Sequence, residues 1–293
     1  MDRTKIPEPD QVSTVSTADG LTLHVEQYRA RLPPRCVVVG IHGFDSHTGR
    51  YRHVALSLAQ AGAAVTTFDC RGHGRSGGAR GHVMRYSDYL DDLDRVVAKA
   101  RETDKELPLV LVAHSHGGTI ALDWALSGRG PAAKLVLAAP LLEVAMKVPG
   151  WKRLLSRPTA RLWPTLTMQN GIKAEDISRD PVVVEETRAD PLIHHVASAR
   201  WFAEVGAAQQ RIRERAEKLD MATFFLVAGQ DKIVNTAVTR AFAERAPGCR
   251  QMRQYDALYH EMFLEPEWPQ VLADVRAFIV NPLAVKYRSP GVA

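Results

Sequence analysis

A short apolar run, a serine and an amphipathic stretch follow one another near the middle of the chain. Residues 109–112 predict a buried strand, residues 119–124 predict a helix, and Ser115 lies between them. A strand that turns directly into a helix brings the two backbones together, so small residues are needed two positions before and two positions after the serine. Ala113 and Gly117 meet that requirement. The pattern therefore predicts a sharp turn that presents the Ser115 hydroxyl at the edge of a sheet.

Short apolar runs and amphipathic stretches alternate along most of the chain. Residues 12–18 and 21–28 flank Asp19-Gly20, a turn dipeptide, and predict an opening hairpin. Strands that alternate with helices form a parallel sheet covered by helices on both faces, so an α/β fold with a doubly wound sheet is predicted. The later strands are expected at residues 36–41, 64–68, 109–112, 134–139, 223–228 and 250–255, and the helices at about 51–61, 86–101, 236–245 and 267–279.

The alternation stops between residues 141 and 215. This stretch contains five prolines and several helix-like segments, and no run in it predicts a strand. A chain of 293 residues is long enough for one domain that carries an insertion. We therefore expect a single domain over residues 1–293, with a core formed by residues 1–140 and 216–293 and a helical cap formed by residues 141–215.

Two later loops supply the partners that a reactive serine needs. A serine hydroxyl becomes a good nucleophile when a histidine accepts its proton, and a carboxylate must orient that histidine. In a doubly wound sheet such residues lie beyond the carboxyl ends of strands. Asp231 and His260 each follow a predicted strand there, and they come after Ser115 in the order expected for this architecture. Asp256 is an alternative acid, but it precedes His260 in the same loop, so Asp231 is favoured.

Two backbone amides are candidates for an oxyanion hole beside Ser115. The sharp turn would aim the amide of His116 at the group that the serine attacks. The second candidate is the amide of Phe44, which follows a His-Gly pair after the strand predicted at residues 36–41. Taken alone, that His-Gly pair is more typical of an ordinary strand-ending turn. The five residues around Ser115, also taken alone, are compatible with a purely structural turn.

The remaining histidines and the cysteines give no evidence for a metal site. His194 and His195 are adjacent in the predicted cap, but no ordered pair of further ligands accompanies them, so a packing or surface role is favoured. Cys36, Cys70 and Cys249 adjoin predicted strands and lack the spacing of metal ligands, which favours buried reduced thiols. We therefore expect no metal and no cofactor.

Composition and charge narrow the class of function. The formal net charge is +5, which is too modest to indicate a nucleic-acid partner without an accompanying motif. The first residues lack the apolar stretch of a secretory signal, and no apolar run approaches the ~18 residues that a transmembrane helix requires. These features predict a cytoplasmic protein.

Five segments of the chain together resemble one known family. They are residues 42–51, residues 69–76, the turn around Ser115, the loop at Asp231 and the pair His260-Glu261. In these segments the chain resembles the monoacylglycerol lipase and lysophospholipase branch of the α/β-hydrolase fold. The resemblance implies a mostly parallel sheet of the eight-stranded type, and a structural role for residues 69–76 beside the site.

The same resemblance implies roles for individual residues. It implies Ser115 as the nucleophile, Asp231 and His260 as its partners, and the amides of Phe44 and His116 as the oxyanion hole. There are two departures from the family pattern. Ala113 replaces the usual first glycine, and a histidine at position 116 stands where an apolar residue is common.

The predicted cap contains a basic segment with apolar residues in it. Its five cations, without an acid among them, are Lys147, Lys152, Arg153, Arg157 and Arg161. Trp151, Leu154 and Leu155 lie between them and are candidates for contact with the substrate. Such a segment can rest on an anionic lipid surface. Packing of an ordinary cap helix on the core, with its charges in solvent, is the alternative, and both can hold together.

These observations favour a serine carboxylic ester hydrolase that acts through an acyl-enzyme. The expected substrate is a small lipidic ester with one acyl chain, such as a monoacylglycerol or a lysophospholipid. A short-chain esterase, thioesterase, peptidase or carbon–carbon bond hydrolase on the same fold stays open. A non-catalytic ligand receptor is disfavoured because Ser115, Asp231 and His260 are all present.

Overall fold

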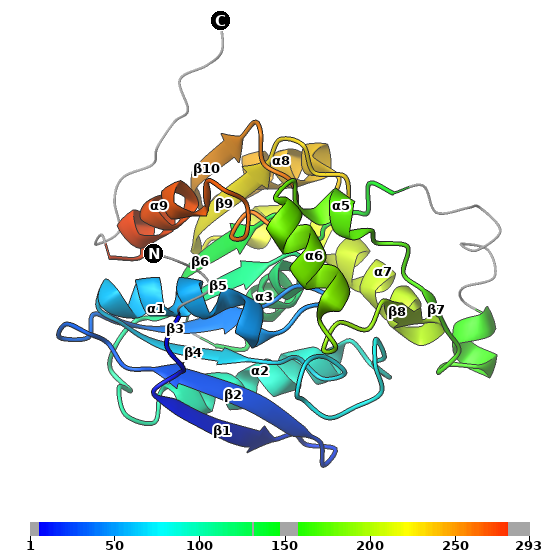
Figure 1. The fold of residues 1–293 in the computed structure, drawn as a ribbon, viewed down its shortest axis with the longest axis horizontal. Helices are drawn as coiled ribbons and strands as arrows, with labels where there is room; N and C mark the ends of the chain where they lie inside the picture. The colour runs from blue at the N-terminus through cyan, green and yellow to red at the C-terminus, as the bar shows by residue number, and fades with distance from the viewer. Residues whose placement is uncertain (1–5, 131, 147–157, 281–293) are drawn as a thin grey trace, which may run out of the picture.

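An eight-stranded sheet forms the centre of the molecule (Figure 1). The computed structural model describes residues 6–130, 132–146 and 158–280. The strand order is β1-β2-β4-β3-β5-β6-β9-β10; β1 and β2 form the predicted hairpin, β2 is antiparallel to β4, and the other neighbours are parallel. The strands are β1 (Gln11–Ser16), β2 (Thr22–Tyr28), β3 (Cys36–Ile41), β4 (Ala63–Phe68), β5 (Leu109–His114), β6 (Ala132–Ala138), β9 (Ala222–Ala228) and β10 (Cys249–Tyr255).

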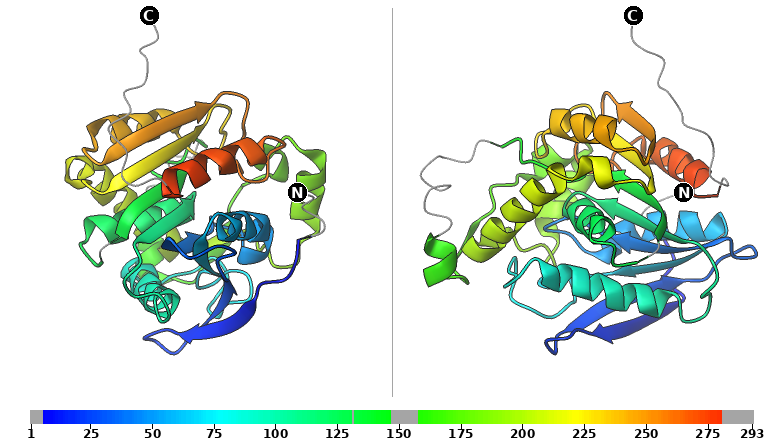
Figure 2. Two further views of the ribbon diagram at one scale, coloured as in Figure 1. Left: turned by 90° about the vertical axis from the view of Figure 1, so that its left-hand side faces the viewer. Right: turned by 180° about the vertical axis from the view of Figure 1, so that it is seen from behind.

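Helices cover both faces of this sheet and divide the core into two layers. Because strand side chains alternate between faces, Val37 and Val39 of β3 lie in one layer and Val38 lies in the other. The helices α1 (Arg52–Gln60) and α9 (Trp268–Val280) contribute to the layer that contains Val38. Seen from behind, α2 and α3 lie in front of the sheet (Figure 2). The helices of that second layer are α2 (Ser87–Ala100), α3 (His116–Leu126) and α8 (Thr236–Arg245).

The elements of the predicted cap include strands, which the sequence did not predict. The strands β7 (Thr167–Gln169) and β8 (Val196–Ser198) pair antiparallel in a small second sheet. Runs of three residues are too short to show the alternation that identifies a strand, so the expectation of helices alone was wrong. The helices of this stretch are α5 (Ala174–Ile177), α6 (Pro181–Ala189) and α7 (Ala199–Arg213), and α7 is joined to the buried Asp123 of α3 by Arg211.

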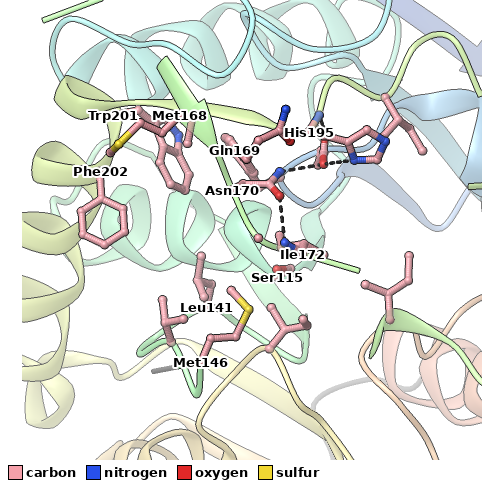
Figure 3. Close-up of a pocket in the computed structure, with 18 of the residues that line it drawn as sticks. Ser115, Leu141, Met146, Met168, Gln169, Asn170, Ile172, His195, Trp201 and Phe202 are labelled. Atoms are coloured by element: carbon pink, nitrogen blue, oxygen red, sulfur yellow. Dashed lines mark hydrogen bonds and ion pairs between the residues drawn. The ribbon is translucent and has the colours of Figure 1, made fainter. Parts of the chain in front are cut away.

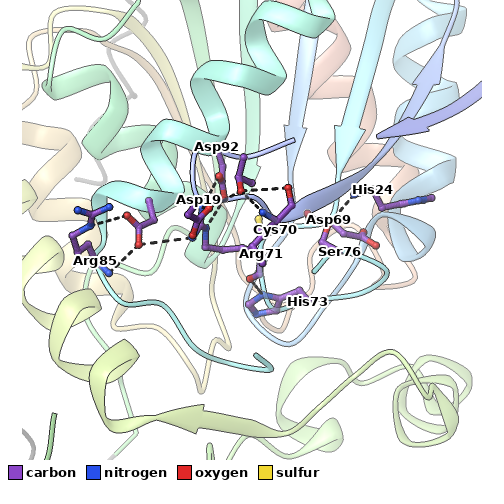
Figure 4. A network of polar contacts seen from close by, with 12 residues as sticks. Asp19, His24, Asp69, Cys70, Arg71, His73, Ser76, Arg85 and Asp92 are labelled. Atoms are coloured by element: carbon purple, nitrogen blue, oxygen red, sulfur yellow. Dashed lines mark hydrogen bonds and ion pairs between the residues drawn. The ribbon is translucent and has the colours of Figure 1, made fainter. Parts of the chain in front are cut away.

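Residues 69–76 form a buried polar network beside the sheet (Figure 4). The guanidinium of Arg71 donates to Asp92 of α2 at 2.6 and 2.7 Å and to Asp19 of the β1–β2 turn at 2.9 and 3.2 Å. Asp69 accepts from the backbone N–H groups of Thr48 and Arg75, both at 2.7 Å. These bonds tie the hairpin, α2 and the loop after β3 together, in agreement with the structural role implied for this segment.

Candidate active site

Ser115 occupies the turn between β5 and α3 in a backbone conformation that few residues adopt. Its φ is 52° and its ψ is −119°, so the turn is strained and is maintained by its surroundings. The N–H of Ser115 donates to the carbonyl of Ala138 at 3.0 Å, and its own carbonyl accepts from Leu141 at 3.0 Å. Both partners come from the end of β6 or just after it. The neighbouring strand thus fixes the turn that the sequence predicted.

Gly117 is the small residue that this turn requires. A Cβ atom at this position would lie 2.4 Å from the carbonyl oxygen of Ile41 and 2.6 Å from that of His42. Both distances are too short for a real Cβ atom. The two oxygens belong to the backbone, so they cannot move aside as a flexible side chain could. The first turn of α3 therefore packs directly on the end of β3, as the pattern of small residues predicted.

Three side chains from separate loops meet in a hydrogen-bonded line. Nε2 of His260 lies 2.9 Å from the hydroxyl oxygen of Ser115, and Nδ1 of His260 lies 2.8 Å from Oδ2 of Asp231. Asp231 also accepts from the backbone N–H groups of Ile233 and Val234 through Oδ1, at 2.8 and 2.9 Å. A carboxylate held in this way fixes the tautomer of the imidazole, so Nε2 can accept the proton of the serine. Asp256, the alternative acid, is exposed and accepts instead from Gln254 at 2.7 Å.

Burial and charge shift the pKa values of His260 and Asp231 in opposite directions. Burial alone would lower the pKa of His260, but the Asp231 carboxylate and the nearby Glu261 outweigh it, and the pKa is raised above 6.5. Burial alone would raise the pKa of Asp231. The charge and hydrogen bond of His260, together with the two backbone donors, hold that pKa below its usual value. The pair is therefore built to stabilise a protonated imidazole.

The loop after β3 lies against Ser115 where a second oxyanion donor was predicted. A Cβ at Gly43 would lie 3.1 Å from the Cβ of Ser115, so the loop that leads into Phe44 passes directly beside the serine. His116 is the first residue of α3, where backbone N–H groups have no acceptor within the helix. The amides of Phe44 and His116 thus belong to segments that adjoin the serine on two sides.

The imidazole of His116 is part of a buried aromatic cluster. Its ring lies edge-on to Tyr89 and Trp201, with centroids 4.9 and 5.4 Å away, and Phe44 packs on Trp201 at 4.0 Å. Burial lowers the pKa of His116 to about 3, so the ring is neutral near pH 7. The histidine that departs from the family pattern is therefore an uncharged ring that connects α3 to α7 of the predicted cap.

A cavity of about 500 Å³ opens beside Ser115 and His260. Leu141, Met146, Trp201 and Phe202 surround the space next to the serine (Figure 3). Most of the lining is apolar, which suits a hydrocarbon chain, while Arg50 and Glu261 add polar groups. Further apolar lining comes from Val144, Leu166, Met168, Ile172, Ile177, Ile193, Ala197 and Ile233. Trp151, Leu154 and Leu155, the predicted substrate contacts, lie outside the described residues.

Asp45 is a site residue that the sequence did not reveal. It follows Phe44 with a φ of 59°, and its Oδ1 accepts from the backbone N–H groups of His194 and His195, both at 2.9 Å. Its Oδ2 accepts from the side-chain amide of Asn170 at 2.8 Å; Asn170 and His195 are both labelled in Figure 3. The carboxylate thus joins the loop that carries Phe44 to three residues of the predicted cap. The partners are more than a hundred residues away in sequence, so no local pattern could have identified them.

The described residues contain no group of three or more His, Cys, Asp and Glu side chains placed to hold a metal ion. His194 and His195 instead lie beside Asp45, their Nδ1 atoms 3.3 and 3.2 Å from its carboxylate. Cys36 and Cys70 are buried free thiols, as the sequence predicted, whereas the free thiol Cys249 is only half-buried.

Several known proteins are similar to this chain in sequence and in fold. The model of the serine aminopeptidase S33 family matches residues 32–267. The chain is 34% identical to a monoacylglycerol lipase of Mycolicibacterium smegmatis, over 85% of its own length and 90% of the relative's. It is 32% identical to the phospholipase YtpA of Bacillus subtilis, over 84% and 95%.

A solved monoacylglycerol lipase of Paleococcus ferrophilus superposes with a TM-score of 0.81 at 27% identity and covers 88% of this chain and 98% of its own. A monoglyceride lipase of Saccharomyces cerevisiae, at 20% identity, shares the fold with a TM-score of 0.83 over 94% and 95%. The chain therefore belongs to the serine aminopeptidase S33 family and is a serine hydrolase of the α/β-hydrolase fold.

Proposed function

We propose that the chain hydrolyses the ester bond of lipids with one acyl chain, monoacylglycerols or lysophospholipids, through an acyl-enzyme on Ser115. The observation that carries the proposal is the line Ser115–His260–Asp231, which opens into a largely apolar cavity. Two relatives that cover most of the chain are named monoacylglycerol lipase and phospholipase, and both names describe hydrolysis of lipid esters.

His260 moves the proton in each half of the proposed reaction. As the Ser115 oxygen attacks the ester carbonyl, its proton passes to Nε2 of His260, and Asp231 stabilises the resulting imidazolium through Nδ1–H. The imidazolium then protonates the departing alcohol, which leaves the acyl group on the serine. A water molecule repeats the sequence: His260 accepts its proton, the acyl–oxygen bond to Ser115 breaks, and the serine regains a proton.

The amides of Phe44 and His116 are the proposed donors to the oxyanion. Negative charge develops on the carbonyl oxygen as the tetrahedral intermediate forms, and fixed donors stabilise that charge without reorganisation. Gly43 and Gly117 allow both segments to approach the serine closely. The Asp45 contact with the cap would hold the Phe44 segment in place while the carbonyl reacts.

The apolar cavity is proposed to hold the acyl chain. Its volume of about 500 Å³ lies within the ~300–1,000 Å³ range of small-molecule sites. Residues 141–215 are proposed to act as the cap over it, and Trp151, Leu154 and Leu155 are retained as proposed contacts from that segment. Ordering an acyl chain among side chains such as Leu141 and Met146 removes apolar surface from water and favours binding.

The cap is also proposed to touch an anionic membrane surface. Leu162, Trp163 and Leu166 are large apolar residues there that are about half exposed or more, and Arg161 adds a cation beside them. Such a combination favours the boundary between lipid head groups and acyl chains. Among the described helices, none combines the length and apolar character that crossing a bilayer demands. The cytoplasmic location stays a prediction.

A substrate panel tests the proposed function. Purified protein and the Ser115→Ala variant would be assayed with monoacylglycerols, lysophospholipids, short-chain esters, thioesters and aminoacyl amides. We expect hydrolysis of the first two classes and a loss of roughly 10⁴-fold or more in the variant. Preference for thioesters or aminoacyl amides would replace the proposed substrate class. Equal turnover by Ser115→Ala, or its labelling by a fluorophosphonate that reacts with the wild type, would overturn the mechanism.

A further inference from the structure

A second carboxylate lies next to the proposed base and is not used by the mechanism above. Glu261 follows His260 directly, is 5% exposed, and lines the cavity beside Ser115. Both of its carboxylate oxygens lie within hydrogen-bond distance of the Tyr51 hydroxyl, at 2.8 and 3.1 Å. Burying a carboxylate in an apolar site is costly unless charge or hydrogen bonds compensate. The cost of burying Glu261 is therefore not explained by packing alone.

His114 connects this carboxylate to the backbone of the proposed base. Nε2 of His114 lies 3.0 Å from the carbonyl oxygen of His260, which makes this nitrogen the donor. Nδ1 of the same ring faces the other way, 3.4 Å from the Tyr51 hydroxyl and 3.9 Å from Glu261. The rings of His114 and His260 are stacked at a tilt, with centroids 4.8 Å apart. Glu261, Tyr51 and His114 thus form one buried unit against His260.

The charges around Glu261 keep it ionised. Burial raises the pKa of Glu261, but positive charge on His114 when that ring is protonated, on Arg50 and on His260, together with the hydrogen bond from Tyr51, outweighs burial and brings the pKa below 4.5. Asp231 and Glu261 are both negative groups that raise the pKa of His260. Burial lowers the pKa of His114, so that ring is neutral near pH 7.

We propose that Glu261 is a positioning residue whose negative charge assists Asp231 in stabilising the protonated form of His260. The inference rests on the proposed function, because it concerns the proton that His260 takes from Ser115. Asp231 acts through a hydrogen bond to Nδ1, whereas Glu261 makes no hydrogen bond to the imidazole and acts through its field in a buried site. Tyr51 and His114 hold the carboxylate and the base in one arrangement.

The pH dependence of covalent labelling tests this role without knowledge of the substrate. A fluorophosphonate reacts with the serine when His260 is neutral, so its second-order rate constant rises with pH through the pKa of His260. Glu261→Gln keeps the size of the side chain and removes its charge. We expect the midpoint of the rise to move to lower pH by about 1 unit, and the plateau rate to fall on the order of tenfold. The shift separates a charge effect from a packing defect, which would lower the plateau alone.

Two further variants complete the experiment. Tyr51→Phe removes the donor to Glu261 and should move the midpoint in the same direction by a smaller amount, which provides a test if Glu261→Gln does not fold. Glu217→Gln removes an exposed carboxylate before the amino end of β9, whereas the site lies at the carboxyl ends of the parallel strands, and it should leave the midpoint unchanged.

The outcomes separate the inference from the function on which it rests. If the wild type is not labelled, or Ser115→Ala is still labelled, the proposed function fails. If Ser115 is labelled but folded Glu261→Gln and Tyr51→Phe both keep the wild-type midpoint, only the role of Glu261 is overturned. Equal shifts in Glu261→Gln and Glu217→Gln would also overturn it, because net charge would then explain the effect.

Discussion

Gly117 lies directly under the carbonyl group of Ile41, so closely that a Cβ on the glycine would be 2.4 Å from that oxygen. This contact packs the first turn of α3 on the end of β3, next to the turn between β5 and α3 that holds Ser115. The serine next to it has a strained φ of 52°. Close backbone packing on both sides of the turn therefore helps to set the position of the hydroxyl.

Gly117→Ala adds only one methyl group, but we expect it to lower both the stability of the fold and the activity of the site. The added methyl group must push α3 away from β3, which should destabilise the fold by about 1–3 kcal/mol. Because Ser115 lies next to the displaced helix, a shift of about 1 Å in its hydroxyl should lower the rate of ester hydrolysis by about 100-fold. Gly206→Ala in α7 is the matched control, because a Cβ there meets nothing within 4 Å. Thermal unfolding and fluorophosphonate labelling of both variants would check this, and a fully active Gly117→Ala protein would contradict it.

The choice between the two acids proposed for His260 can be measured directly. Asp231→Asn retains a similar shape but holds the wrong tautomer of the imidazole, so we expect turnover to fall by about 10⁴-fold. Asp256→Asn changes an exposed side chain that accepts from Gln254, and its turnover should stay within about twofold of wild type. Steady-state assays on the preferred ester would compare them. Similar losses in both variants would show that the carboxylate partner is misassigned.

The pH profile of the wild type follows from the raised pKa of His260. The base must be neutral to accept the serine proton, so kcat/KM should rise with pH and level off above the pKa of the free enzyme. Because Asp231 and Glu261 outweigh burial and raise this pKa, the midpoint should lie above 6.5. Measurements from pH 5 to pH 9 with a neutral monoacylglycerol would show the position of the rise. A midpoint below 6.5 would mean that burial outweighs the two carboxylates.

The parts of the site that could be predicted from the sequence are those that one local segment encodes. A strand, a serine between small residues and a helix identify the Ser115 turn, and the ends of β9 and β10 identify the loops of Asp231 and His260. These features depend on hydrophobic periodicity and on chain order, which are both visible along the sequence. The strands of the main sheet could be predicted for the same reason.

The unpredicted parts depend on contacts between distant segments. Asp45 accepts from amides about 150 residues further along the chain, and Tyr51 reaches Glu261 across 210 residues. Nothing in a single sequence indicates which donors such a carboxylate meets. The strands β7 and β8 were missed because each gains its hydrogen bonds from the other and is too short to show a period of two.

Asp45→Asn tests the contact between the loop that carries Phe44, a proposed oxyanion donor, and the proposed cap. Asparagine tolerates a positive φ, so the backbone is kept, but its NH₂ group removes an acceptor that the N–H groups of His194 and His195 or the amide of Asn170 require. An unpaired buried donor costs about 1–3 kcal/mol, which should loosen this part of the cap. We expect faster hydrogen exchange at residues 194–198 and a higher KM. Asp91→Asn, at a surface ion pair, is the control, and equal exchange in both variants would argue against the contact.

Binding of the cap to lipid can be tested through its exposed aromatic residue. Trp163 is 64% exposed, and Leu162 beside it is 66% exposed, so both are free to enter a lipid surface. Burying one large apolar side chain contributes about 1.5–3 kcal/mol, so Trp163→Ser should weaken binding to vesicles by at least about tenfold. Leu32→Ser removes a residue that is 57% exposed in the loop before β3, at the amino ends of the parallel strands and away from the exposed Trp163, and it should have no effect. Vesicle sedimentation with anionic and neutral lipid would measure both variants. Equal binding to the two lipids would remove the electrostatic part of the proposal, and equal losses in the two variants would place the contact elsewhere than on the cap.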